Sequence, residues 1–107
     1  LVKSYIVLKQ PELAVTKLRQ VLAEQPGHYV ARNLLGELYL ATGKSEAAEV
    51  ELKMAIEQSE GWAIPYHNLA SIYASGGRVE ESVALLEGGI AATGGSPLLV
   101  TGLASLL

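Results

Sequence analysis

Apolar residues recur along the chain at the three- and four-residue spacing that places side chains on one face of a helix. Residues that favour turns separate the apolar segments, among them Pro26-Gly27, Gly43, Gly76-Gly77 and Gly94-Gly95. The pattern therefore predicts an all-α chain. The predicted helices cover residues 11–24, 29–41, 46–59, 64–74, 79–92 and 98–107, after the end of an earlier helix over residues 1–8.

The helical segments repeat at a fixed period. Segment 33–39, Asn-Leu-Leu-Gly-Glu-Leu-Tyr, is matched by segment 67–73, His-Asn-Leu-Ala-Ser-Ile-Tyr, so the period is 34 residues (67 minus 33). A period of this length is typical of stacked helical units that contact only their neighbours. We interpret the recurring tyrosines as core residues. Five series share the register: Leu1, Leu35, Leu69 and Leu103; Tyr5, Tyr39, Tyr73 and Leu107; Ala14, Ala48 and Ser82; Leu18, Leu52 and Leu86; Val21, Ala55 and Gly89.

This pattern resembles the tetratricopeptide repeat, a 34-residue helix-turn-helix unit with small residues where its two helices touch. The residues that carry the resemblance in the middle copy are Leu35, Gly36, Tyr39, Ala48, Leu52 and Ala55. The resemblance implies an α-α superhelix, a right-handed solenoid of antiparallel helix pairs. It implies a partial repeat over 1–28, full repeats over 29–62 and 63–96, and a partial repeat or cut capping helix over 97–107. Because the chain begins at Leu1, inside a repeat, we expect a fragment of a larger protein.

The chain departs from the family pattern at several positions. Arg32 and Tyr66 replace the early tryptophan in successive copies, and the closing proline occurs only as Pro26. Each glycine inside a helix costs about 1 kcal/mol relative to alanine. Because Gly88 lies beside one of the substituted positions, we expect the helix over 79–92 to be bent or frayed near its end. The third copy carries three further substitutions: Ala70 for the glycine, and Ser82 and Gly89 for the two alanines.

Charge and composition argue against several classes of partner. The net charge is −3, and the eight Lys and Arg residues are scattered, so the chain lacks the basic stripe that would neutralise nucleic-acid phosphates. The absence of cysteine excludes disulfides, thiolate metal sites and thiol catalysis. The longest apolar run, residues 97–107, has 11 residues, short of the roughly 20 that span a bilayer. We expect neither nucleic-acid binding nor direct membrane insertion.

In the family that the chain resembles, the first helix of each pair lines a concave groove. Apolar residues mixed with uncharged hydrogen-bonding groups suit a peptide or an amphipathic helix. The resemblance assigns the groove to Val30, Asn33, Leu34, Glu37, Leu40, Ile64, His67, Asn68, Ser71 and Ser75. Flanking positions in the register are Lys3, Ile6, Val7, Ala41, Ala74, Leu98, Thr101, Gly102 and Ser105.

Asn68 is the sharpest single candidate in this groove, because family members often use an asparagine there to hold a ligand's backbone. The alternative is that Asn68 caps local polar groups beside a neighbouring helix. One subset of the family grips the C-terminal carboxylate of chaperone peptides with a lysine and asparagine cluster. Here the matching positions hold Asn33, His67 and Ser71, and Lys3 is the one basic residue placed in the groove. We therefore do not expect a carboxylate clamp.

Residues 98–107 are apolar around nearly the whole helix circumference, which favours burial against another surface. One interpretation is the first half of a further repeat. Another is a self-assembly module in which subunits stack end to end as homo-oligomers. The candidate self-association residues are Leu98, Leu99, Leu103, Leu106 and Leu107.

The sequence offers little for catalysis. Ser71, His67 and Glu37 could be drawn as a triad, but all three fall on regular helices and nothing supplies an oxyanion hole. His67 has no second likely metal ligand one turn away. The glycine pairs lack the strand and the Gly-Lys-Ser/Thr of a phosphate loop. We predict a scaffold that binds a protein or peptide, is not an enzyme, and needs no metal or cofactor.

Overall fold

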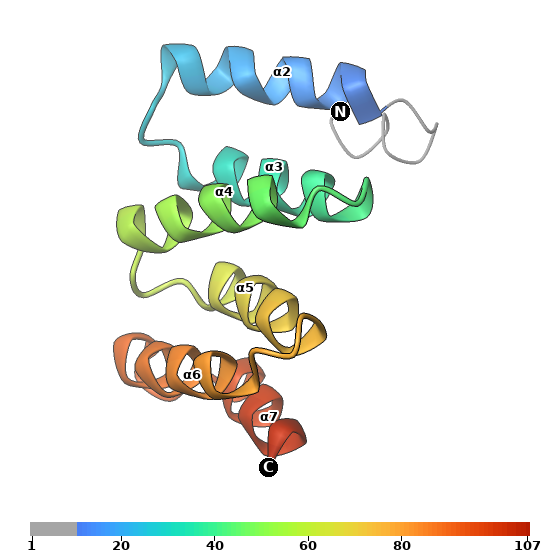
Figure 1. Ribbon diagram of the computed structural model, residues 1–107. Coiled ribbons are helices and arrows are strands. Elements are labelled where there is room, and N and C mark those ends of the chain that lie inside the picture. Colours follow the sequence, from blue (N-terminus) through green and yellow to red (C-terminus); the bar gives the residue numbers. More distant parts are fainter. Residues whose placement is uncertain (1–10) are drawn as a thin grey trace. The chain divides into compact units, whose positions relative to one another are not determined.

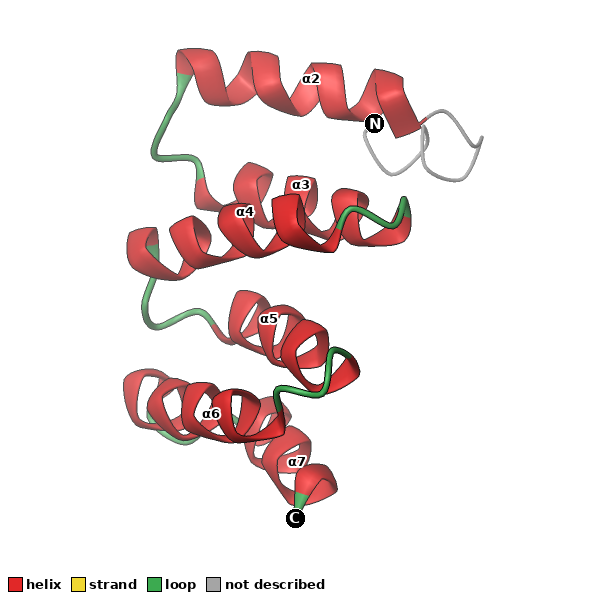
Figure 2. Cartoon of the chain, viewed as in Figure 1, coloured by secondary structure: helices red, strands yellow, loops and turns green. Residues whose placement is uncertain are grey.

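The computed structural model describes residues 11–107, which form six helices joined by short loops, with no strand among them (Figures 1 and 2). This confirms the predicted all-α class. The helix end expected over residues 1–8 and the flanking groove positions Lys3, Ile6 and Val7 lie outside the described residues. The helices are α2 (Pro11–Glu24), α3 (Tyr29–Ala41), α4 (Ser45–Gln58), α5 (Ala63–Ser75), α6 (Val79–Thr93) and α7 (Pro97–Leu106).

The chain divides into two compact units. The first unit runs up to Ala55 and the second comprises Ile56–Leu107, so the boundary falls within α4. The helix bounds agree with the predicted ones to within one residue at every end. The helix over 79–92 was expected to be bent or frayed near its end. Fraying is not seen, since α6 continues through Gly88 and Gly89 to Thr93.

The turns that end α3 and α5 share one geometry. Gly43 and Gly77 have φ of 79° and 80°, the left-handed region that glycine adopts without steric cost. In each turn the amide of the following residue donates to a carbonyl in the preceding helix, that of Tyr39 or Tyr73, at 2.8 Å in both cases. This is the Schellman arrangement. The two turns are one repeat period apart, so the repeat extends to the hydrogen bonds of the backbone.

In the first unit, α3 packs closely against α4. A Cβ added to Gly36 would lie 2.8 Å from Leu52 Cγ, closer than real Cβ atoms approach, so only glycine fits here without rearrangement. On the other side, α3 contacts α2, and Arg19 Nε donates to the Tyr39 hydroxyl at 3.1 Å. The buried apolar residues of the unit are Ala14, Leu18, Ala31, Leu35, Leu38, Tyr39, Ala48, Leu52 and Ala55.

In the second unit, α5, α6 and α7 contact one another, and their core is built around Tyr66, Ala70, Leu86 and Leu99. A Cβ added to Gly89 would lie 2.7 Å from Tyr66 Cδ1 and 2.8 Å from Leu99 Cδ1. Glycine at this position therefore lets α5 and α7 side chains meet over α6. Packing of this kind outweighs the low helix propensity of glycine, which explains why α6 does not end early.

The tyrosine series belongs to the core, as predicted for the described members. Tyr39 and Tyr73 are 4% and 6% exposed, and Tyr5 lies outside the described residues. Ser82, which replaces the alanine of the family pattern, is fully buried, and its hydroxyl donates to the Ala70 carbonyl at 2.8 Å. A buried hydroxyl with a hydrogen-bond partner avoids the penalty of an unsatisfied polar group.

Candidate functional site

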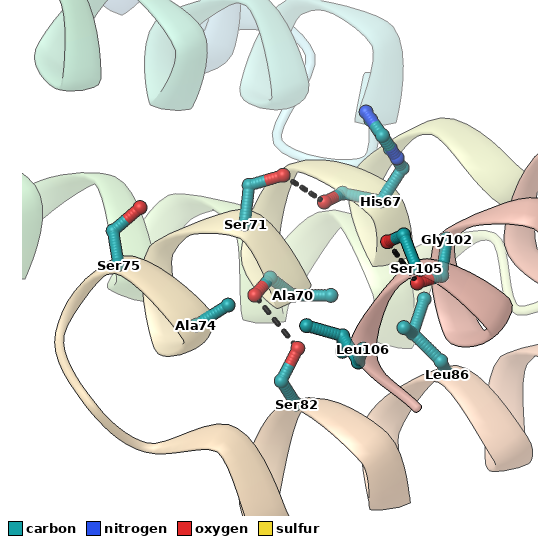
Figure 3. Close-up of a pocket in the computed structure, with 10 residues that line it drawn as sticks. All are labelled: His67, Ala70, Ser71, Ala74, Ser75, Ser82, Leu86, Gly102, Ser105 and Leu106. Carbon is teal, nitrogen blue, oxygen red and sulfur yellow. Dashed lines mark hydrogen bonds between the residues drawn. The ribbon is translucent and has the colours of Figure 1, made fainter.

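A cleft of about 240 Å³ opens in the second unit between α5 and α7 (Figure 3). The first half of α6 contributes the bottom of the cleft through Ser82 and Leu86. The lining contains neither a carboxylate nor a lysine or arginine side chain. The full set is His67, Ala70, Ser71, Ala74 and Ser75 from α5, Ser82 and Leu86 from α6, and Gly102, Ser105 and Leu106 from α7.

Three of the four serine hydroxyls that line this cleft donate to backbone carbonyls. Ser71 Oγ donates to the His67 carbonyl at 3.0 Å, and Ser105 Oγ donates to the Gly102 carbonyl at 2.7 Å (Figure 3). Both serines are exposed, so their oxygens remain open to solvent. The imidazole of His67 stands at the rim and points away from the apolar bottom of the cleft (Figure 3). The rim hydroxyls of Ser71 and Ser105 therefore donate their protons to backbone carbonyls of the regular helices that carry them.

Gly102 keeps the cleft deep. A Cβ added at this glycine would lie 3.7 Å from Leu86 Cδ2, which is ordinary van der Waals contact. Packing within the unit therefore does not require glycine at this position, in contrast to Gly89. A larger side chain at residue 102 would project into the space above Leu86 and reduce the depth of the cleft.

The structure brings three of the predicted groove residues of α5 together. His67, Ser71 and Ser75 line the cleft at successive helical turns, together with Gly102 and Ser105 from the flanking positions. Ile64 and Asn68 are half-buried and lie outside its lining, and Asn68 already has an interaction partner. The residues missed by sequence reasoning are the bottom of the cleft, Ala70, Ser82, Leu86 and Leu106. The recurrence of Leu86 at the repeat period signalled a core role, and Leu86 is 2% exposed although it belongs to the lining of the cleft.

The predicted groove residues of α3 lie in the first unit and are less uniform. Val30 and Leu40 are exposed at 39% and 37%, whereas Leu34 and Glu37 are half-buried. Asn33 is only 2% exposed, and its side-chain amide donates to Glu37 Oε2 at 3.2 Å. The amide of Asn33 is thus directed to a carboxylate one turn along the same helix.

The predicted self-association residues of α7 also separate into groups. Leu99 is fully buried in the core of the second unit, and Leu103 and Leu106 pack against that core. Leu98 and Leu107 are 37% and 89% exposed. The exposed large apolar residues of this segment are therefore Leu98 and Val100 of α7 and Leu107, which follows the helix.

Other chemistry finds no assembled site in the described part of the chain. Among residues 11–107, no group of three or more His, Cys, Asp or Glu side chains is placed to hold a metal ion. The Ser71 hydroxyl bonds the backbone of His67 rather than its ring. None of the described helices is both long enough and apolar enough to cross a membrane.

Comparison with known families identifies the class. A family model for the tetratricopeptide repeat matches residues 8–70, and a second model with the same description matches residues 63–92. The first match alone covers more than half of the chain. The protein belongs to the tetratricopeptide-repeat family. A sequence search of curated proteins gave no match.

Solved structures share the fold over 98% of this chain. The first tetratricopeptide-repeat domain of Spaghetti (RPAP3) bound to the HSP90 peptide SRMEEVD has a TM-score of 0.82 at 13% identity, with 83% of that chain covered. The Sgt2 domain from Aspergillus fumigatus has a TM-score of 0.84 at 20% identity, with 71% of that chain covered. MamA has a TM-score of 0.82 at 21% identity, with 61% covered. At these identities the likeness shows the fold alone.

Proposed function

We propose that this protein is an interaction scaffold that binds a peptide segment in the cleft between α5 and α7, without chemistry of its own. The observation that carries the proposal is the cleft itself, which combines an apolar bottom with uncharged hydroxyl groups along its rim. Its volume of about 240 Å³ lies below the roughly 300–1,000 Å³ typical of small-molecule pockets. Such a cleft suits one or two side chains of a peptide better than a whole cofactor.

The solved neighbours support peptide binding as a use of this fold. The first domain of Spaghetti (RPAP3) holds an HSP90 peptide, and the second domain of human RPAP3 holds the HSP70 peptide SGPTIEEVD. Both peptides end in acidic residues. Neither lysine nor arginine lines the cleft described here, and the chain carries a net charge of −3. We infer that its peptide is not an acidic tail of this type.

Within the second unit, Ile64 and Asn68 of α5 extend the proposed contact surface. The first unit offers a surface of its own on α3, where Val30 and Leu40 are exposed. We assign supporting roles to Leu34 and Glu37, which are half-buried, and to Asn33, which is buried against Glu37. This assignment takes residues 29–62 and 63–96 as the two full repeats.

Gly102 provides the direct test. Peptides would be selected on the wild-type chain from a display library, and their affinities compared with those for Gly102→Val by calorimetry. Because the valine methyl groups occupy the cleft while its Cβ makes only ordinary contact with Leu86, we expect the fold to persist and affinity to fall at least about tenfold. Gly88→Ala, on open surface of α6, is the control. Selected peptides that bind Gly102→Val unchanged, or a selection that yields none, would contradict the proposal.

One observation favours a second function, self-association through α7. Leu98, Val100 and Leu107 are 37%, 48% and 89% exposed, an unusual apolar content for a free helix surface. Sedimentation equilibrium of the wild-type chain would then show mass that rises with concentration. Leu98→Glu combined with Leu107→Glu would abolish the rise, whereas Val50→Glu, at an exposed apolar residue of α4, would not. A wild-type chain that stays monomeric at all concentrations rejects this second function.

A further inference from the structure

We propose that the cleft between α5 and α7 takes an uncharged extended peptide segment whose backbone N–H groups donate hydrogen bonds to Ser71 and Ser105. This inference rests on the proposed function, since it specifies the polarity of the peptide that the same cleft binds. It specifies which partner, ligand or protein, donates each hydrogen bond at the site.

The direction follows from the hydroxyl protons. A serine hydroxyl has one hydrogen to donate and two lone pairs that accept. Ser71 Oγ and Ser105 Oγ lie 3.0 and 2.7 Å from helix carbonyl oxygens, and a carbonyl has no hydrogen, so each hydroxyl must be the donor. Both protons point into the helix backbone. The lone pairs of both exposed oxygens remain for the ligand.

A third of the four serine hydroxyls in the cleft also donates within the protein. Ser82 Oγ donates to the Ala70 carbonyl at 2.8 Å, and this residue is fully buried at the bottom of the cleft. If a ligand carbonyl or carboxylate approached Ser71 or Ser105, the lone pairs of its oxygen would face the lone pairs of the serine oxygen. It gains a hydrogen bond only if the serine gives up its bond to the helix. A ligand N–H group gains a hydrogen bond to the serine oxygen while the bond from serine to the helix stays intact.

An extended chain can reach both acceptors. Ser71 lies on α5 and Ser105 on α7, so the two oxygens line opposite sides of the cleft. Successive residues of an extended peptide direct their N–H groups to opposite sides of the chain, so neighbouring residues can serve the two serines. Side chains of that peptide can then reach Leu86 and Leu106 at the bottom of the cleft.

The cleft lining contains no carboxylate, which argues against a ligand whose donor is positively charged. A lysine ammonium that entered the cleft would lose solvent and meet only neutral acceptors, and burying an unpaired charge is unfavourable. Backbone amides carry the required N–H group without charge. Uncharged peptide segments with small aliphatic side chains are therefore the ligand class.

Backbone N-methylation tests the direction of these hydrogen bonds, because it removes one N–H group while leaving every carbonyl. The probe is the tightest peptide from the display selection, amidated at its C-terminus and N-methylated at one residue at a time. We expect at least one methylation to weaken binding about fivefold or more, the scale of one hydrogen bond. That penalty should disappear in the Ser71→Ala, Ser105→Ala variant. It should persist in Thr16→Ala, which removes a matching hydroxyl-to-carbonyl bond on α2.

The outcomes separate the two proposals. A peptide whose affinity still depends on Gly102, but whose methylation scan is flat or whose free-carboxylate form binds tighter than the amide, overturns this inference and leaves the proposed function standing. A methylation penalty that remains in the double serine variant also overturns it. A selection without any peptide that depends on Gly102 overturns both.

Discussion

The two units use different side chains at the same repeat position, one period apart. In the first unit, Arg32 Nη2 donates to the Pro26 carbonyl at 2.9 Å. In the second, the Tyr66 hydroxyl donates to the Glu60 carbonyl at 2.8 Å. Each donor lies six residues after its acceptor (32 minus 26, 66 minus 60), so the same backbone carbonyl is satisfied by a guanidinium in one copy and by a phenol in the other.

This exchange extends to neighbouring positions. Arg32 is 9% exposed and pairs with Glu51 at 3.0 Å. The residue one period after Glu51 is Leu85, which packs against the core that contains Tyr66. The charged pair Arg32–Glu51 of the first unit is thus replaced in the second by Tyr66 and Leu85, which belong to one apolar cluster.

The small residue at the end of the helix pair changes as well. Gly89 leaves room for the Tyr66 ring, which a Cβ at that position would approach to 2.7 Å. The first unit has the buried Ala55 at the corresponding position, and Arg32 stands where the second unit has the Tyr66 ring. Arg32, Glu51 and Ala55 therefore correspond as a set to Tyr66, Leu85 and Gly89. Departures from the family pattern within one copy are compensated within that copy.

Breaking the charged pair should have the largest effect. Glu51→Ala leaves the Arg32 guanidinium buried without a counter-charge, and Arg32 Nε already lacks a hydrogen-bond partner. Removing one member of a buried pair costs about 3–5 kcal/mol, and we expect the low end because both side chains keep slight exposure. Urea unfolding followed by circular dichroism measures the loss. The control, Glu49→Ala, breaks a surface pair with Lys53 that contributes about 0.5 kcal/mol or less. Equal losses of unfolding free energy for Glu51→Ala and Glu49→Ala would contradict a stabilising role for the buried Arg32–Glu51 pair.

Substitutions at the adjacent glycines of α6 should have opposite signs. Gly89→Ala forces the Tyr66 ring and Leu99 to move, and we expect a net loss of about 1–2 kcal/mol after the helix-propensity gain. Gly88→Ala meets nothing within 4 Å, so it should stabilise α6 by up to about 1 kcal/mol. Thermal unfolding of the two variants gives the comparison. A stabilising Gly89→Ala would show that the ring does not need the space.

Tyr66→Phe should give the smallest effect and a change in pH dependence. The variant loses the hydrogen bond to the Glu60 carbonyl, about 1 kcal/mol. Burial, and secondarily the charge of Glu60, raises the pKa of Tyr66 above its usual value. The folded state therefore holds this proton more tightly than the unfolded chain. The associated stability is complete below about pH 10 and is lost as pH rises through the raised pKa. Unfolding at several alkaline pH values should show a shallower decline for Tyr66→Phe than for wild type, and identical slopes would contradict the assignment.

Local sequence determined the helices and their ends. The spacing of apolar residues, together with glycines such as Gly43 and Gly77 that adopt positive φ, is a property of consecutive residues and can be read directly. The repeat period, read from segments 33–39 and 67–73, indicated the family, and three residues that the register assigned to the groove or its flanks, His67, Ser71 and Gly102, line one cleft in the structure. All of these depend on short-range or strictly periodic relations.

Tertiary structure decided what each face contacts. Helix propensity alone predicted fraying at Gly88 and Gly89, but the ring of Tyr66 and the side chain of Leu99 fill the space that Gly89 leaves. Asn33 shares a register position with His67, yet Asn33 is 2% exposed while His67 stands at the rim of a cleft. Burial and pocket shape depend on side chains that come from distant parts of the chain. The period specifies where a residue points, and the volumes of its neighbours in space decide whether it is covered.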